Sequence, residues 1–247
     1  SYPVDLPRHA LKRAIAEADV IHTNNSFRGL QGVKKPMVIH YHGSLFRRSP
    51  GNLIRQQRAR KAIGTVSTLD LWLLAPDETE WLPAPYDLDW LAGFRKPSET
   101  LRVGHAPTDR KVKSTDAFLK ACEQVPEVEP VLIERQRWQK TLEKKGTVDF
   151  FYDQAILGYG NNAIEAWGMG IPVICGAQPD TLAEMRNRFD EIPFYLTTPD
   201  TIADALRAML DPDVRAEYAT RGRVHAERFH ADKVVVAQLE DLYGRVG

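Results

Sequence analysis

The chain of 247 residues is long enough for one large α/β unit or two smaller ones, and its 43% hydrophobic residues suffice for a packed core. Its 33 basic side chains balance 33 acidic ones, so we expect no overall attraction to nucleic acid or an anionic membrane. No apolar run approaches the ~20 residues needed to span a bilayer, and no signal-peptide pattern is visible. Cys122 and Cys175 lie in apolar surroundings that indicate buried thiols rather than a disulfide. These features predict a globular, cytoplasmic protein in which any contact with a membrane or another subunit is peripheral.

The first half of the chain alternates short apolar runs with amphipathic segments, which is typical of the strands and helices of a parallel sheet. Helices are expected at residues 11–18 and 53–62, and strands at residues 19–23, 37–42 and 62–67. The basic run RRSPGNLIRQQRARK (47–61) is favoured as a solvated helix face, although such a run can also attract an anionic acceptor or a lipid surface. Proline and polar residues at 82–100 separate this half from the next.

The second half repeats the alternation with five strands and intervening helices, which predicts a doubly wound nucleotide-binding domain. Strands are expected near residues 101–106, 130–134, 148–153, 171–176 and 193–197, and helices near 114–125, 136–145, 161–169, 180–189, 201–210, 213–229 and 230–246. Ligands bind beyond the carboxyl ends of the strands in such sheets. His105, Glu134, Asp153 and Gly176 fall at those ends, so their side chains are expected to converge on one edge.

The stretch GYGNNAIEAWGMGIPVIC carries the most chemical information, because a glycine-bounded loop runs directly into an expected helix. Gly158 and Gly160 let the backbone approach a ligand closely, and a helix that opens at Asn161 or Asn162 presents unpaired N–H groups and a positive dipole end. Glu165 lies one helical turn further along, where its carboxylate can accept hydrogen bonds from sugar or ribose hydroxyls. The pattern predicts a site for a diphosphate ester, with an ordinary connection between helix and strand as the alternative.

Several segments besides this loop resemble one known group of proteins. They are RVGHAPTDRKVKSTDAFLKA (102–121), FFYDQ (150–154), ADVIHTNN (18–25) and KPMVIHYHGS (35–44). Together with the loop they resemble the retaining, nucleotide-sugar-using GT-B glycosyltransferases of the family 4-like, group 1 type. The resemblance covers most of the chain and implies two Rossmann-like parallel-sheet domains facing a cleft, the acceptor-side one at 1–96 and the nucleotide-sugar-binding one at 97–230. It also implies a terminal helix at 231–247 that crosses back to the N-terminal domain, which is shortened because the family's usual first strand and glycine-rich loop do not precede Asp19.

The same resemblance assigns catalytic roles to three side chains. Arg110 and Lys113 correspond to the arginine and lysine that hold the donor diphosphate, and His42 occupies the family's histidine–glycine position facing the cleft. Arginine can grip two phosphate oxygens at once, whereas lysine acts as a mobile point charge. His42 would polarise a phosphate or an acceptor hydroxyl, with a buried or capping role equally open. Because these cations and the helix opening at Asn161 already supply positive charge, we expect catalysis without a metal or another cofactor.

One departure from the family pattern concerns the donor sugar. Many members carry two glutamates in the donor loop, but this chain has Leu157 eight positions before Glu165. Asp153 and Gln154, which match the family's strand end before the loop, are therefore expected to bind the donor together with Tyr159.

The resemblance implies a hexosyltransferase that moves a sugar, with retention, from a nucleotide-diphosphate sugar to an acceptor that the sequence does not identify. A glycan, a lipid, a protein or a nucleic-acid base would each be an acceptor of this kind. Two alternatives stay open: a non-catalytic nucleotide-sugar-binding or scaffold subunit, and a GT-B-related nucleotide-sugar epimerase. The nucleobase is expected to stack on an aromatic residue, for which Phe151, Tyr152 and Trp138 are available.

Overall fold

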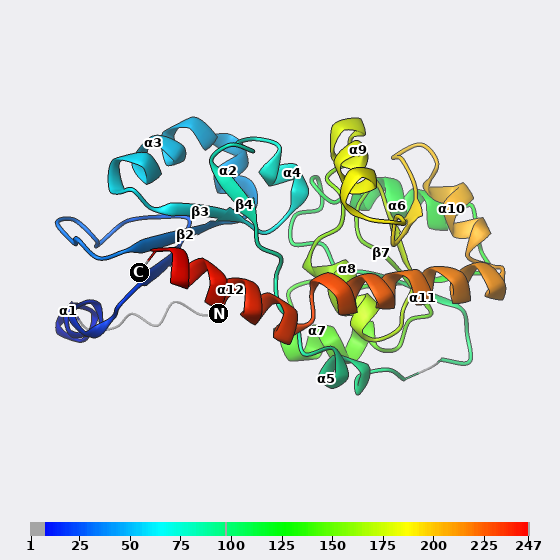
Figure 1. The fold of residues 1–247 in the computed structure, drawn as a ribbon. Coiled ribbons are helices and arrows are strands. Elements are labelled where there is room, and N and C mark those ends of the chain that lie inside the picture. The colour runs from blue at the N-terminus through cyan, green and yellow to red at the C-terminus, as the bar shows by residue number, and fades with distance from the viewer. Residues whose placement is uncertain (1–7, 97, 247) are drawn as a thin grey trace.

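The computed structural model describes residues 8–96 and 98–246, which form two parallel sheets side by side (Figure 1). The N-terminal sheet has the strand order β1-β2-β3-β4, and the C-terminal sheet has the order β6-β5-β7-β8-β9. The strands are β1 (Ile21–Asn24), β2 (Met37–Tyr41), β3 (Ile63–Val66), β4 (Thr79–Trp81), β5 (Arg102–His105), β6 (Glu129–Leu132), β7 (Phe150–Tyr152), β8 (Val173–Cys175) and β9 (Tyr195–Leu196). This is the two-sheet α/β fold that the alternating sequence pattern predicts, since parallel neighbours require crossover connections.

Helices make those connections and cover the faces of both sheets (Figure 1). They are α1 (Arg8–Glu17), α2 (Gly43–Arg48), α3 (Pro50–Arg60), α4 (Leu69–Trp72), α5 (Leu88–Ala92), α6 (Thr115–Cys122), α7 (Trp138–Lys145), α8 (Asn161–Gly168), α9 (Pro179–Arg188), α10 (Ile202–Ala208), α11 (Pro212–Phe229) and α12 (Asp232–Val246). Two buried clusters lie on the C-terminal sheet, one containing Trp167 and the other containing Phe118.

Four short elements, β4, α2, α4 and α5, are not evident in the sequence pattern because three to six residues are too few to show a periodicity. Helix α5 lies within the proline-rich stretch 82–100 and begins at a local cap, since the Asp87 carboxylate accepts from the backbone N–H of Trp90 at 2.8 Å. Its buried Leu88 and Leu91 pack against Gly168 of α8, so this connection forms part of the C-terminal core.

The last helix, α12, packs against the N-terminal sheet. Val235 and Leu242, two turns apart on one face of α12, join Val38 of β2 and Leu82 in a buried cluster. The preceding helix, α11, lies along the C-terminal sheet (Figure 1). The chain therefore passes between the two halves a second time at His230, where the Tyr86 N–H donates to the His230 carbonyl at 2.8 Å.

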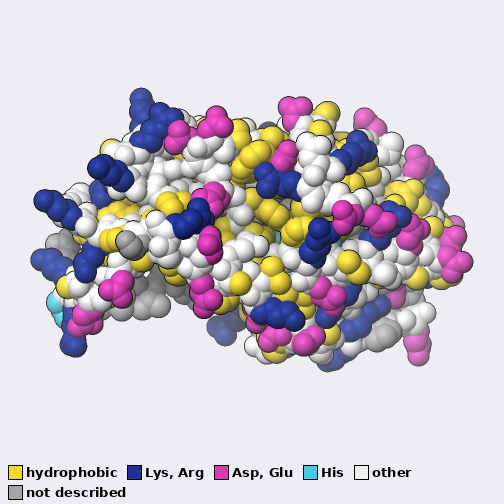
Figure 2. Space-filling view, viewed as in Figure 1, with side chains coloured by type: hydrophobic (Ala, Val, Ile, Leu, Met, Phe, Trp, Pro, Cys, Tyr) yellow, Lys and Arg dark blue, Asp and Glu magenta, His cyan; other side chains and the backbone are white. Residues whose placement is uncertain are grey.

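The basic run at 47–61 is partly structural. Arg47 forms an ion pair with Asp70 at 2.6 Å, and Arg58 forms an ion pair with Glu78. The Arg60 guanidinium donates to a backbone carbonyl of the loop before β2 and lies over an aromatic ring there. Figure 2 shows Lys and Arg side chains at the end of the molecule that carries α1 and α3, in agreement with 12 basic and 3 acidic residues at positions 8–72. Attraction of an anionic surface by the remaining cations stays a prediction.

Candidate functional site

A cavity of about 1410 Å³, called the cleft below, lies between the two sheets where the carboxyl ends of several strands meet. Its N-terminal wall includes His22, Asn24, His40 and His42, and its C-terminal wall includes Arg110, Lys113, Glu134, Trp138, Asn161, Asn162 and Glu165. His42 follows β2 directly, and Glu134 follows β6 by two residues. This is where doubly wound sheets place their ligands, because the side chains at strand ends face open space there.

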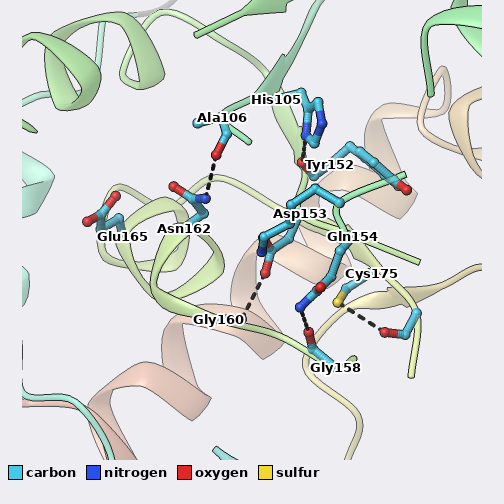
Figure 3. A network of polar contacts seen from close by, with 12 residues as sticks. His105, Ala106, Tyr152, Asp153, Gln154, Gly158, Gly160, Asn162, Glu165 and Cys175 are labelled. Carbon is cyan, nitrogen blue, oxygen red and sulfur yellow. Dashed lines mark hydrogen bonds and ion pairs between the residues drawn. The ribbon is translucent and has the colours of Figure 1, made fainter. Parts of the chain in front are cut away.

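The start of α8 contributes Asn161, Asn162 and Glu165 to the C-terminal wall, and Figure 3 shows Asn162 and Glu165 on this helix. Helix α8 begins after Gly160, whose N–H donates to Asp153 Oδ2 at 2.8 Å. The Asn162 side chain is fixed by its own hydrogen bond to the Ala106 carbonyl at 2.8 Å. The N–H groups at the start of a helix have no carbonyl partner within it, so those of Asn161 and Asn162 remain suited to an anion.

Lys113 reaches the same place from the loop after β5. Its Nζ lies 2.5 Å from Asp153 Oδ1, and the Asp153 side chain is fully buried at the end of β7. Both oxygens of that carboxylate are thus engaged, one by Lys113 and the other by the Gly160 backbone. Asp153 therefore holds the lysine and the loop before α8 in place, and it lies behind the cleft rather than in its lining.

Arg110 forms a two-pronged ion pair with Glu134, with Nε–Oε1 and Nη2–Oε2 distances of 2.8 and 2.9 Å. The hydrogen bonds raise the pKa of Arg110 and lower that of Glu134. The Arg110 side chain is 49% exposed, so water screens the pair and the guanidinium can exchange its partner for a phosphate at low cost. The sequence pattern predicts only that Glu134 lies at a strand end. The structure adds that its carboxylate holds the Arg110 guanidinium.

Glu165 is nearly buried on the inner face of α8 and is bound by two side chains from α7. Lys145 Nζ lies 2.5 Å from Glu165 Oε2, and the Trp138 indole N–H donates to Oε1 at 2.8 Å. Burial lowers the pKa of the Lys145 ammonium, while the Glu165 carboxylate opposes that shift. Burial and the same carboxylate raise the pKa of the Tyr86 hydroxyl. The sequence pattern did not identify Lys145 as part of this site, because nothing in the helix end EKKG indicates that this lysine is fully buried.

The N-terminal wall holds uncharged histidines. Burial lowers the pKa of His40 to about 3, with further lowering by His42 and His22, and burial also lowers the pKa of those two neighbours. The His42 Nε2 lies 3.1 Å from Asn24 Oδ1, and the His40 and His42 ring centroids are 4.5 Å apart. Repulsion between closely spaced imidazolium ions explains part of the shift. His42 thus meets the cleft as a neutral imidazole at neutral pH.

Two of the expected donor ligands lie behind the loop. Tyr159 is buried in the C-terminal core, with its hydroxyl 3.0 Å from His225 Nε2 and 3.1 Å from His230 Nε2. Gln154 is buried and donates through Nε2 to the carbonyl of Gly158, which adopts a positive φ of 83° at the turn (Figure 3). These side chains shape the loop from its inner side, so the structure brings His42, Arg110, Lys113, Asn161, Asn162 and Glu165 together in the cleft and leaves Asp153, Gln154, Tyr159 and Gly160 outside its lining.

Other chemistry-bearing side chains of the described part have structural surroundings. His105 is fully buried between the Tyr152 carbonyl and the Thr115 hydroxyl, and burial lowers its pKa to about 4. Cys122 and Cys175 are buried free thiols. Across residues 8–96 and 98–246, no group of three or more His, Cys, Asp or Glu side chains is arranged to hold a metal ion. Within the same residues no helix is both long enough and apolar enough to cross a membrane.

No protein-family model matches the sequence, and neither does any curated protein. Solved structures do resemble the fold. HepE from Anabaena, crystallised with UDP and glucose, has a TM-score of 0.70 at 14% identity, over 95% of this chain and 80% of that one. A glycosyltransferase from Rickettsia africae gives 0.68 at 11%, over 97% and 79%. An α-glucosyltransferase bound to UDP and a 13-mer DNA gives 0.64 at 9%, over 96% and 84%. These likenesses confirm the GT-B fold that the sequence predicts.

Proposed function

We propose that this protein is a glycosyltransferase that transfers a sugar from a nucleotide-diphosphate sugar to an acceptor. The observation that carries the proposal is the C-terminal wall of the cleft, where Arg110, Lys113 and the opening of α8 surround one space. Positive groups from two separate loops, the one after β5 and the one before α8, converge there at the carboxyl ends of parallel strands. A diphosphate fits this arrangement, since it presents several anionic oxygens to separate donors at once.

The same groups suit the chemistry of the transfer. Breaking the bond between a sugar and a diphosphate leaves negative charge on the departing nucleoside diphosphate. Arg110 can stabilise that charge after exchanging Glu134 for phosphate oxygens, and the first N–H groups of α8 stabilise it without any rearrangement. Lys113 contributes less net charge, because the buried Asp153 carboxylate balances it.

His42 faces this site from the opposite wall. Its pKa is lowered by burial, so at neutral pH the ring accepts or donates a hydrogen bond as a neutral group rather than acting as a cation. We assign it the task of orienting a reacting hydroxyl or a phosphate oxygen. The acceptor then enters from the N-terminal side, between His42 and the aliphatic residues Leu82 and Leu239.

We further propose retention of the anomeric configuration, catalysis without a metal ion and a cytoplasmic location. Retention rests on the resemblance to the GT-B family 4-like enzymes. Metal-free catalysis is supported by the cations and the helix opening that already face the diphosphate position. The location is supported by two free thiols, which are common in reducing compartments.

A second candidate function is a subunit that binds a nucleotide sugar without turnover. The observation in its favour is the donor loop, where Leu157 stands in place of a carboxylate and both Asp153 oxygens are already engaged. A donor sugar would then meet fewer fixed acceptors for its hydroxyls than in a competent transferase. Binding without hydrolysis or transfer would be the result.

Thermal shift measurements with UDP-, GDP- and ADP-sugars test the binding step, because a ligand of the native state raises the melting temperature. We expect one nucleotide class to raise it and Arg110→Ala to suppress that rise. Arg48→Ala provides the matched control, since Arg48 is an exposed arginine of α2 outside the cleft lining. A parallel assay of donor hydrolysis separates the two functions: turnover supports the transferase, and binding without turnover supports the subunit. No shift with any nucleotide sugar would contradict both.

A further inference from the structure

The N-terminal wall of the cleft presents one charged side chain at neutral pH. Its histidines are neutral, and none of the described residues that line this wall is Asp or Glu. Arg47, in the last turn of α2, lines the wall together with the hydroxyl-bearing Ser67 and Thr68 that follow β3. Because the proposed diphosphate site is on the opposite wall, Arg47 is available to a different ligand group.

A carboxylate behind the wall fixes the Arg47 side chain. Arg47 Nε donates to Asp70 Oδ2 at 2.6 Å, and the other oxygen of Asp70 accepts from the Thr68 hydroxyl at 2.5 Å. The Asp70 side chain is 10% exposed and is not part of the lining, whereas that of Arg47 is 29% exposed. The same arrangement holds Lys113 on the opposite wall, where the buried Asp153 carboxylate lies behind a cleft-lining cation. Each wall therefore contains a cation that is held from behind.

The Arg47 guanidinium keeps unused hydrogen-bond donors. Within residues 8–96 and 98–246, Nε is the only one of its three nitrogens that donates a hydrogen bond. Arg110, by contrast, uses both Nε and Nη2 on the two oxygens of Glu134. The two Nη groups of Arg47 can therefore donate together to two oxygens of a phosphate or a carboxylate, without breaking the contact with Asp70.

Arg47 also lies close to the proposed acceptor position. His42 immediately precedes α2, and Arg47 lies four residues after the first residue of that helix, about 6 Å along its axis. Both side chains line the cleft, so one sugar-sized ligand can contact His42 through a hydroxyl and Arg47 through an anionic group. The 12 basic and 3 acidic residues at positions 8–72 favour the approach of such a ligand.

We infer that the acceptor bears a phosphate or carboxylate group, which the two Nη groups of Arg47 bind while His42 contacts the reacting hydroxyl. The inference rests on the proposed function and adds the chemical class of the acceptor. Arg47 is then a specificity-determining residue. Asp70 is a positioning residue, because it acts on the ligand only through Arg47.

Binding calorimetry with three related sugars tests this site. The probes are glucose, glucose 6-phosphate and glucuronate, titrated into the free protein and into protein saturated with the nucleoside diphosphate that it binds best. With the diphosphate position filled, at least one anionic sugar should bind roughly 10-fold tighter than glucose. This is the low end for a charge-assisted hydrogen bond, because Asp70 balances part of the Arg47 charge. The tighter of the two anionic sugars identifies phosphate or carboxylate as the preferred group.

Variants of the ion pair assign the preference to Arg47. Arg47→Gln should remove it and leave glucose affinity unchanged, because the variant loses both the Nη donors and the charge. Arg48→Gln is the matched control, since the neighbouring arginine is exposed and outside the cleft lining. Asp70→Asn should retain the preference, because an amide oxygen can still accept from Arg47 Nε. If loss of the Asp70 partner unfolds Arg47→Gln, the double variant Arg47→Gln, Asp70→Asn gives the same test without an unpaired carboxylate.

Two results would overturn the anionic acceptor. The first is equal affinity for glucose and both anionic sugars in the saturated protein, or no binding of either anionic sugar. The second is a preference that persists in Arg47→Gln, because another group would then bind the anion. Failure of every nucleoside diphosphate to bind would overturn the proposed function instead. In that case the difference between wild type and Arg47→Gln in the free protein still decides whether Arg47 binds the anionic sugar.

Discussion

The two walls of the cleft differ in the charge of their polar side chains. Three ion pairs of increasing burial lie along or just behind the C-terminal wall: Arg110–Glu134, Lys113–Asp153 and Lys145–Glu165. The N-terminal wall contains three histidines whose pKa values burial lowers, so they are neutral at neutral pH. A wall of paired charges suits an anionic donor, and a wall of neutral imidazoles suits the hydroxyl groups of an acceptor.

The three ion pairs differ in burial, and this difference indicates which cations can change partners to bind a ligand. Arg110 is half exposed, and its guanidinium can leave Glu134 for a ligand. The Lys113 and Lys145 pairs have a fully buried member each, so a ligand that took either cation would leave a carboxylate uncompensated in a low-dielectric interior. Arg110 is therefore the cation most free to change partners, whereas Lys113 and Lys145 also stabilise the fold through their carboxylate partners.

The largest effect is expected at the most buried pair. Lys145→Met should lower the free energy of unfolding by about 3–5 kcal/mol, because Glu165 would remain as an uncompensated buried charge. The double variant Lys145→Met, Glu165→Leu should recover most of that stability and bind the nucleotide diphosphate more weakly than wild type, because Glu165 lines the cleft. Urea denaturation and calorimetry measure the two effects. A single variant as stable as wild type would show that the pair does not support α7 and α8.

The next effect separates the two cations of the proposed diphosphate site. Arg110→Ala should weaken nucleotide-diphosphate binding by about 1.5–3 kcal/mol, the contribution of a charge-assisted hydrogen bond, and leave nucleoside affinity and stability nearly unchanged. Lys113→Ala should weaken the same binding and also lower stability, because it leaves the buried Asp153 carboxylate without its ion-pair partner. Calorimetry and denaturation of both variants provide the comparison. Equal losses for nucleoside and diphosphate would place Arg110 away from the phosphates.

A smaller effect on the free energy of unfolding is expected from the protonation of His40 in the N-terminal wall as the pH changes. The pKa of His40 is about 3 in the folded state and about 6.5 in the unfolded chain, so between pH 6.5 and 4.5 only the unfolded state gains this proton. Stability therefore falls as pH falls, and His40→Gln should reduce that loss by about 2 kcal/mol. The pKa of Glu134 lies below its ordinary 4.5, so its contribution is lost only at lower pH. Identical pH profiles of wild type and variant would contradict the buried neutral state of His40.

The smallest expected effect is none at all. If the cations and the helix opening of the C-terminal wall stabilise the leaving diphosphate, an excess of EDTA should leave donor turnover unchanged. Activity that disappears in chelator and returns with Mg²⁺ or Mn²⁺ would show that a cation supplies the charge that we assign to Arg110 and the α8 amides.

The sequence by itself determined the parts of the fold that local patterns encode. Alternating apolar runs identified both parallel sheets, and the loop ending at Gly160 marked the opening of α8 at Asn161. Strand ends identified the edge where the cleft lies, because every parallel strand delivers its carboxyl end to the same side. Resemblance of spaced motifs predicted the GT-B fold, and it selected Arg110 and His42, which do line the cleft.

Only the tertiary structure decided which of these side chains meet one another. Tyr159 stands between two glycines of the loop before α8, yet it turns inward because His225 of α11 and His230, just after that helix, offer its hydroxyl partners within the core. Lys145 meets Glu165 across 20 residues, and Arg110 meets Glu134 across 24, because β6, β5 and β7 lie side by side in an order that differs from the chain order. Periodicity reports whether a residue faces a core, but partners of buried charges depend on sheet order and helix packing, which no local pattern encodes.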